Sequence, residues 1–233
     1  MRTFYISDIH GHYTAFMKLL DWNKWDPSTD QLIIGGDLIN RGPDSADVLH
    51  FAKTFQEQYP KHIHVLCGNH EEMMLWYMQG TSPMWLQHGG VETLQSFRQQ
   101  FGEDGWQIAE DYVPWLASLP LTYEDDFAVY THAGINTNYS INQQPRDTMW
   151  TSFRDTLQQD KHALLKWNHN KPIFRGHSPI QAVTEKGAYT HCDLGLGVLP
   201  PSEAALALVD VTERTYIRCD AEGNITKHEI VQS

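Results

Sequence analysis

Cysteine is scarce in this sequence of 233 residues, where three positions hold it. Cys67, Cys192 and Cys219 are scattered, odd in number and form no Cys-x-x-Cys pair, so nothing in their spacing predicts a disulfide framework or a thiolate metal site. Such sparse use of cysteine is typical of buried thiols in a reducing compartment. We therefore expect a cytoplasmic protein.

Long apolar runs and basic side chains are scarce as well. No apolar run approaches the length of about 18 residues that a membrane-spanning helix needs, and the N-terminal segment reaches Asp8 before the apolar core of a signal peptide can form. Lys and Arg number 17 against 29 for Asp and Glu, which gives a formal charge of −12. This balance argues against nucleic acid and anionic membranes as partners, because both require a basic surface. We expect residues 1–233 to form a single domain with its own core.

Short apolar runs alternate with helical patterns in the first third of the chain. Runs over 3–6, 31–34 and 63–67 predict strands, each followed by apolar residues at helical spacing, and three such units in succession predict a parallel sheet. Residues 80–118 predict helices. Further strands are predicted at 121–123, 128–131, 172–174, 204–211, 215–219 and 225–230. The C-terminal strands lack intervening helices, so we expect them to be antiparallel and to form a second sheet.

Five predicted strand ends carry Asp, Asn or His beside glycine. They are Asp8–Gly11, Gly36–Asp37, Gly68–Glu71, Thr131–Gly134 and Arg175–His177. Ligand-binding groups gather at the carboxyl ends of strands in open α/β sheets, and glycine permits the tight turns that bring neighbouring loops together. We therefore expect these side chains to converge on one site.

The candidate ligands combine imidazole with carboxylate and amide oxygen and include no thiolate, a mixture that suits Mn, Fe, Zn or Ni. Six residues are too many for one catalytic ion with open positions and suit two ions, with Asp37 as the bridge; they are Asp8, His10, Asp37, Asn69, His132 and His177. Two ions roughly 3.5–4 Å apart can hold a hydroxide between them for in-line attack on phosphorus. Their charge would attract a phosphate dianion even to an acidic chain, and Arg41 would add a planar fork for phosphate oxygens.

Together these motifs resemble the signature of the calcineurin-like metallophosphoesterases, and within that superfamily the phosphoprotein phosphatase branch with its bacterial members. The resemblance runs from residue 8 to residue 177 and includes the segment Gly36–Gly42. It implies an α/β fold, a four-layer α/β/β/α sandwich with a mixed pair of sheets, and a dinuclear centre that is commonly activated by Mn²⁺. Asp8, His10 and Asp37 would hold one ion, and the second would be held by Asp37, Asn69, His132 and His177.

The resemblance also implies roles for side chains next to the ligands. His70 matches the proton donor to the leaving group, a role that contributes typically about 10²–10⁴-fold to the rate, so Asp37, Arg41 and His70 are the expected catalytic residues. Arg41 matches a phosphate-binding arginine, and Asn69 is also expected to bind the substrate. A second phosphate-binding arginine is expected downstream; we predict Arg154, with Arg146 or Arg175 as alternatives.

One position departs from the pattern of the eukaryotic-type members. They usually place an aspartate directly before the arginine, where it resembles a carboxylate partner for the catalytic histidine, whereas this chain has Asn40. An amide can orient the imidazole ring of His70 but supplies no negative charge. We therefore expect the pKa of His70 to be lower than in aspartate-containing relatives.

The leading functional expectation is a serine/threonine protein phosphatase that acts on a phosphoprotein or a small phosphorylated substrate. The alternative is a symmetrical bis(5'-nucleosyl)-tetraphosphatase, since that branch also lacks the aspartate at position 40. The tryptophans of the middle segment could stack on adenine, although packing in the core explains them more simply; they are Trp76, Trp85, Trp106 and Trp115. A third hypothesis, a non-catalytic binding module of the same fold, predicts lost ligands, yet all six are present.

Overall fold

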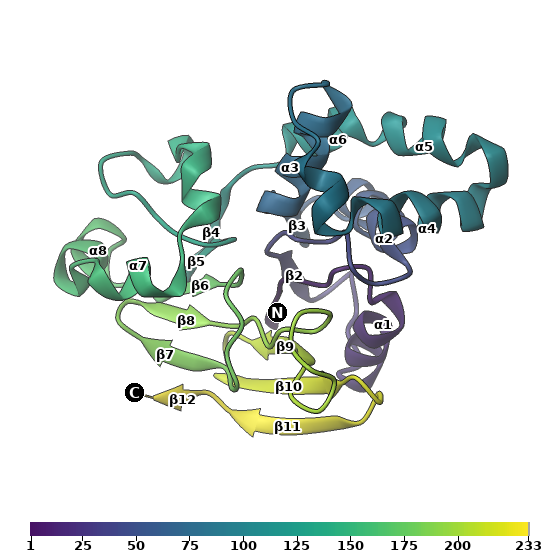
Figure 1. The fold of residues 1–233 in the computed structure, drawn as a ribbon. Helices are drawn as coiled ribbons and strands as arrows, with labels where there is room; N and C mark the ends of the chain where they lie inside the picture. Colours follow the sequence, from purple (N-terminus) through teal and green to yellow (C-terminus); the bar gives the residue numbers. More distant parts are fainter. Residues whose placement is uncertain (233) are drawn as a thin grey trace.

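The computed structural model describes residues 1–232, which form two six-stranded mixed sheets (Figure 1). The first sheet has the order β11-β10-β9-β1-β2-β3. Its strands are β1 (Thr3–Ile6), β2 (Gln31–Ile34), β3 (Ile63–Val65), β9 (Ala205–Asp210), β10 (Thr215–Asp220) and β11 (Ile225–Glu229). The second has the order β12-β7-β8-β6-β5-β4. Its strands are β4 (Thr122–Glu124), β5 (Val129–Thr131), β6 (Ile173–Arg175), β7 (Thr184–Lys186), β8 (Tyr189–His191) and β12 (Val231–Gln232).

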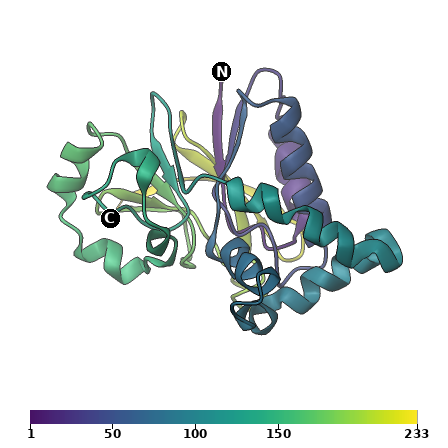
Figure 2. The same cartoon turned by 90° about the horizontal axis from the view of Figure 1, so that it is seen from above.

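Helices cover both outer faces of the sheet pair, with α1 to α6 on one side and α7 and α8 on the other (Figure 2). The α-helices are α1 (Tyr13–Trp22), α2 (Ser45–Gln58), α3 (Asn69–Met78), α4 (Val91–Phe101), α5 (Gly105–Asp111), α6 (Val113–Ser118), α7 (Phe153–Gln158) and α8 (Lys161–Trp167). Short helices of other types are η1 (Leu86–Gly90), η2 (Gly102–Asp104), η3 (Ile141–Gln143) and η4 (Arg146–Trp150). This is the predicted four-layer α/β/β/α sandwich. Every helix within residues 1–232 is too short or too polar to cross a membrane.

The two sheets meet across an apolar layer rich in aromatic rings. Tyr5 of β1 stacks on Tyr130 of β5 with ring centroids 5.9 Å apart. The Tyr5 hydroxyl donates a hydrogen bond of 2.9 Å to the carbonyl oxygen of Thr131, so a buried polar group on one sheet is satisfied by the other. These contacts hold the carboxyl ends of β1 and β5 next to each other.

The C-terminal strands are antiparallel, as predicted, but the prediction that they form a second sheet is wrong. β9 pairs with β1, so β9, β10 and β11 extend the first sheet, and the second sheet is built from β4 to β8 with β12. The reason lies in the two apolar faces of β9. Leu206 and Leu208 pack in the core beneath the helices, while Ala207 and Val209 pack between the sheets. A strand that is apolar on both faces belongs inside a sheet with both faces covered.

Candidate dinuclear metal centre

The loops that leave β1, β2, β3, β5 and β6 meet at one point between the two sheets. Backbone hydrogen bonds join neighbouring loops, from the N–H of His10 to the carbonyl of Asp37 at 2.9 Å and from the N–H of Gly176 to the carbonyl of His132 at 2.8 Å. A pocket of about 90 Å³ opens there. Its lining residues are His10, Asp37, Arg41, Asn69, His70, His177, Pro179, Asp193 and Val198.

One group of ligand atoms comes from Asp37, His132 and His177, with all three atoms within 4.8 Å of one another. The Nδ1 atom of His132 donates to the carbonyl of Gly35 at 2.9 Å, which leaves a lone pair on Nε2. That bare nitrogen lies 2.9 Å from Oδ1 of Asn69 and 3.5 Å from Oδ1 of Asp37, both of which are acceptors. Buried acceptors that face one another repel unless a cation lies between them, so this donor set fits a metal ion.

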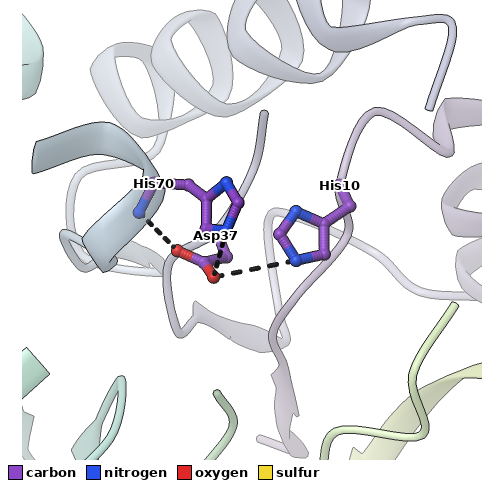
Figure 3. Close-up of side chains that lie close together, drawn as sticks. All are labelled: His10, Asp37 and His70. Atoms are coloured by element: carbon purple, nitrogen blue, oxygen red, sulfur yellow. Dashed lines mark hydrogen bonds and ion pairs between the residues drawn. The ribbon is translucent and has the colours of Figure 1, made fainter. Parts of the chain in front are cut away.

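A second group consists of His10, Asp37 and His70 (Figure 3). The Nδ1 atom of His10 donates to the carbonyl of Ile39 at 2.8 Å, and its bare Nε2 faces Oδ2 of Asp37 at 3.7 Å. Arg41 donates to the same Nε2 at 2.7 Å. Asp37 belongs to both groups, the position that a bridging carboxylate needs.

Asp8 is buried beside these groups without joining either of them. Its carboxylate accepts the backbone N–H of His177 at 3.0 Å. A Cβ atom on Gly176 would overlap that carboxylate, so the glycine allows the β6 loop to approach the β1 loop. The structure thus places all six predicted ligands at the meeting point of the loops, and their individual coordination roles stay predictions.

The backbone of the site is strained. Six of its non-glycine residues have φ values between 45° and 75°, the left-handed region that such residues rarely occupy; they are Asp8, His10, Asp37, Asn40, Arg41 and His177. Such conformations persist where the surrounding structure imposes them, and they cluster at functional sites. Here they turn successive side chains of short loops toward one pocket.

Glu71, in the first turn of α3, was not predicted to have a role at the site. Its fully buried carboxylate accepts three backbone N–H groups at 2.8 Å, from Asp37, Leu38 and Gly68. It therefore holds the β2 loop against the beginning of α3. Part of this arrangement has a signal in the sequence. Gly68 precedes α3 and Glu71 follows it by three residues, which is the spacing of a capping box.

Burial determines the charge states of the groups in the site. Burial lowers the pKa of His10 well below its usual value, lowers that of His132, and, with the neighbouring His132, lowers that of His177 to about 3. These rings are therefore neutral at pH 7, the state that a metal ligand requires. Burial, together with the negative charges of Asp8 and Glu71, raises the pKa of Asp37 well above its usual value. The nearby charge of Arg41 lowers the pKa of Asp37 but does not offset these effects.

The predicted arginines are distributed unevenly around the site. Arg41 lines the pocket, whereas Arg154 is exposed on α7 and is not among the lining residues. Arg146 forms an ion pair of 2.6 Å with Glu72, and Arg175 is buried beneath the β6 loop, where it donates to the carbonyl of Gly176. Among the described residues, Arg41 is the arginine that lines the pocket.

The tryptophans considered for adenine stacking lie outside the pocket lining. Trp85 is fully buried, Trp115 donates to Gln56 at 2.9 Å, and Trp106 is exposed on α5. Trp76 stacks on Trp150 with centroids 5.8 Å apart. Packing explains Trp85, Trp115 and Trp76 directly.

Comparison with solved structures places the fold among phosphatases. A protein serine/threonine phosphatase from Saccharomyces cerevisiae superposes with a TM-score of 0.63 at 16% identity, over 100% of this chain and 81% of that one. A cold-active protein tyrosine phosphatase gives 0.60 at 19% identity, over 97% and 78%. At these identities the likeness concerns the fold alone.

Comparison with curated proteins distinguishes between the two expected activities. The symmetrical bis(5'-nucleosyl)-tetraphosphatase of Methylobacillus flagellatus is 32% identical over 204 residues, which cover 88% of this chain and 68% of the relative. Other relatives of the same name match over 143 residues, and the chain spans about half their length.

These relatives overturn the leading expectation of a serine/threonine protein phosphatase and favour the alternative. The error has a chemical source. The roles that the resemblance implies for Asp37, Arg41 and His70 concern the phosphoryl group, and they say little about what the phosphoryl group is attached to.

The sequence model of the calcineurin-like phosphoesterases matches residues 1–208. Matched motifs and the two groups of ligand atoms lie within that range. The chain is therefore a metallophosphoesterase hydrolase and belongs to the calcineurin-like phosphoesterase family.

Proposed function

We propose that this enzyme hydrolyses dinucleoside tetraphosphates symmetrically, as its curated relatives are named to do. Water adds to one of the two central phosphorus atoms, the bond from that phosphorus to the central bridging oxygen breaks, and two nucleoside diphosphates leave. The 32% identity over 88% of the chain carries this proposal. Free, buried thiols at all three cysteines accord with a cytoplasmic location, which we include in the proposal.

Two divalent ions, which we propose to be Mn²⁺, would be held by the two groups of ligand atoms. His10 and Asp37 of the second group, joined by Asp8 as the family resemblance implies, would hold one ion, and the other would be held at the site of the facing acceptors by Asp37, Asn69, His132 and His177. When bound, such ions supply Lewis acidity and positive charge to the reacting phosphoryl group. The neutral imidazole rings and the carboxylate of Asp37 are groups that would bind such positive ions.

The side chains of the pocket divide the remaining tasks. Arg41, whose guanidinium lies 2.7 Å from Nε2 of His10, has the position and the planar fork to bind phosphate oxygens. His70 presents Nε2 at 3.9 Å from Oδ2 of Asp37, where it can donate to the oxygen of the leaving diphosphate. A pocket of about 90 Å³ has room for a phosphoryl group, and the nucleosides must extend outside it.

A direct comparison of substrates tests the proposal. The enzyme is loaded with Mn²⁺ and given diadenosine tetraphosphate or a phosphoserine peptide at equal concentration, and the products are separated by ion-exchange chromatography. We expect diadenosine tetraphosphate to be the preferred substrate and ADP the sole nucleotide product. Faster release of phosphate from the peptide, or AMP and ATP as products, would refute it. Metal analysis of the same preparation should find two ions per chain.

A further inference from the structure

A second pocket lies beside the pocket of the metal centre, which is here called the metal pocket. We call the second one the side pocket; it is lined by residues from 12–18, by Pro43, Asp44 and Leu196, and by residues 219–223. Its volume is about 350 Å³, whereas that of the metal pocket is about 90 Å³. Pockets that bind small molecules typically enclose roughly 300–1,000 Å³. The side pocket is therefore large enough for a nucleoside.

Three segments of the chain line both pockets. The segment after β1 supplies His10 to the metal pocket and His12 to the side pocket, and the segment after β2 supplies Arg41 and Pro43 in the same way. The loop after β8 lines both pockets with residues from 193–198. A substrate that is too long for the metal pocket therefore meets the side pocket along the same loops.

Gly197 lies where the two pockets adjoin. Leu196 before it lines the side pocket, and Val198 after it lines the metal pocket. A Cβ atom on Gly197 would lie 2.8 Å from Nε2 of His12 and 3.5 Å from Cβ of Arg41. Gly197 is exposed and has a φ of 78°, which favours glycine. It thus provides a surface without a side chain, across which a phosphate chain can pass from one pocket to the other.

The two pockets differ in charge. Three carboxylates line the side pocket, those of Asp44, Asp220 and Glu222, against the single ammonium group of Lys18. This balance repels phosphate, whereas Arg41 and the proposed ions attract phosphate to the metal pocket. The rest of the side pocket is mainly apolar, with alanine, proline, leucine and cysteine side chains. It therefore suits the uncharged nucleoside part of a nucleotide.

Two polar side chains of the side pocket are available to a ligand. Within residues 1–232, the carboxylate of Asp44 accepts no hydrogen bond and the ammonium group of Lys18 forms no ion pair. The turn between β10 and β11 lies beside α1 (Figure 1), and a Cβ atom on Gly223 in that turn would overlap Nζ of Lys18. Asp44 can accept from ribose hydroxyl groups or from an amino group of the base, and Lys18 can donate to a ring nitrogen.

A pocket of about 400 Å³ lies elsewhere, lined by residues from 135–137, 147–151 and 159–164. None of the residues that line the metal pocket comes from these ranges. A ligand bound there would share no wall with the reacting phosphates. Size alone does not distinguish this pocket from the side pocket, but the shared loops do.

We propose that the side pocket binds one nucleoside of the dinucleoside tetraphosphate, with the phosphate chain extending over Gly197 to Arg41 in the metal pocket. This inference rests on the proposed function. Binding energy from a part of the substrate that does not react favours the substrates that carry that part. A phosphoserine peptide carries no nucleoside, so the side pocket would select against it.

The kinetic test fills the side pocket in the enzyme loaded with Mn²⁺. We expect Ala15→Phe to lower kcat/KM for diadenosine tetraphosphate by about tenfold or more, because the nucleoside is excluded. Ala163→Phe is the matched control, since Ala163 is likewise the third residue of its helix and lines the pocket of about 400 Å³. Wild-type kcat/KM in Ala15→Phe, or an equal loss in the control, would overturn the proposal.

A second variant keeps the proposal testable if Ala15→Phe does not fold. Lys18→Gln removes an exposed ammonium group, and we expect KM for diadenosine tetraphosphate to rise about 2- to 10-fold, the range of one hydrogen bond, with kcat little changed. Lys61→Gln is its control, because Lys61 is also exposed and precedes β3, at the opposite end of the sheet from the site. Equal KM values in Lys18→Gln and the wild type would contradict a role of Lys18 in nucleoside binding.

A binding test needs neither metal nor turnover. Saturation-transfer NMR with adenosine and the EDTA-treated protein should show transfer to the adenosine protons in the wild type and in Ala163→Phe, but not in Ala15→Phe. No transfer in the wild type, or undiminished transfer in Ala15→Phe, would overturn the proposal. If adenosine binds as expected but the wild type does not convert diadenosine tetraphosphate to ADP, the proposed function fails and the nucleoside site stands. If ADP is produced and Ala15→Phe binds adenosine like the wild type, the inference alone fails.

Discussion

Glu71→Gln tests whether one buried carboxylate holds the metal-binding loops together. The side chain is fully buried, and its two oxygens accept the backbone N–H groups of Asp37, Leu38 and Gly68, each at 2.8 Å. Oε2 accepts two of them and Oε1 accepts the third. A glutamine can direct its single oxygen to the Asp37 and Gly68 groups, but its NH₂ group then faces the N–H of Leu38, which sets two donors against each other.

The energetic cost follows from these three bonds. A hydrogen bond to a charged group contributes about 1.5–3 kcal/mol and a neutral one about 0.5–1.5 kcal/mol, so two weakened bonds and one lost bond cost roughly 4 kcal/mol. The substitution also removes a buried charge, and burial is the main reason that the pKa of Glu71 is raised. That gain offsets part of the loss, and we expect a net destabilisation of about 2 kcal/mol. For a chain of this size the melting temperature should fall by about 4–8 °C.

Two measurements together separate this role from general instability. Urea unfolding in EDTA should give the loss of about 2 kcal/mol, and titration with Mn²⁺ should show weaker binding, because Asp37 lies in the loop that Glu71 holds. Glu110→Gln is the control, since Glu110 is only partly buried and accepts one solvent-exposed hydrogen bond, from the indole of Trp106 at 2.8 Å. Wild-type stability together with unchanged metal affinity in Glu71→Gln would refute the reasoning.

The shared carboxylate, the ions and the buried histidines each give a further expectation. Asp37→Asn should abolish turnover and reduce bound metal to fewer than two ions per chain; turnover at the wild-type rate would contradict a dinuclear centre. Mn²⁺ at about 100 times its Kd should stabilise the fold by about 2.7 kcal/mol for each ion bound, and each ion should raise the melting temperature by about 5–10 °C over the EDTA-treated protein, which calorimetry measures. Burial and the charge of Arg175 lower the pKa of His191 to about 3. Below about pH 6.5 the imidazole of His191 binds a proton in the unfolded chain but not in the folded chain. The contribution of His191 to the free energy of unfolding is therefore complete above about pH 6.5 and is lost as the pH falls toward about 3. In His191→Leu the fall of unfolding free energy between these pH values should be shallower by up to about 1.4 kcal/mol per pH unit, and an unchanged slope in urea titrations would contradict it.

The six candidate ligands and Arg41 could be placed from the sequence because each lies in the segment that leaves a strand. β1, β2 and β3 are adjacent and parallel, so their carboxyl ends must meet, and Asp8, Asp37 and Asn69 come together with them. For these residues, the position relative to a predicted strand is therefore enough to predict the position in the fold.

Contacts between distant segments could not be placed in this way. Trp85 and Thr93 reach Asn40 across 45 and 53 positions, and no local pattern shows that a helical segment folds back onto a strand end. Asp193 lines the pocket from the loop after β8, a strand of three residues that the sequence analysis did not predict. The pairing of β9 with β1 also depends on the covering of both apolar faces of β9. The hydrophobic periodicity of the sequence does not show which sheet will provide that cover.

The acidity of the chain and the negative charge of the proposed substrate predict an order of binding. Burial, with Asp8 next, raises the pKa of both Asp37 and Asp193 well above the usual value, so without ions these carboxyls resist ionisation. For such groups, stability is greatest below their unfolded pKa and is lost as pH rises through the folded one. Bound ions would offset that penalty by pairing with the carboxylates, and they would also supply positive charge for the proposed tetraphosphate substrate. Substrate should therefore bind to the metal-loaded site, and the stabilisation by Mn²⁺ should be larger at pH 8 than at pH 5, where protons compete with the ions for Asp37 and the site histidines.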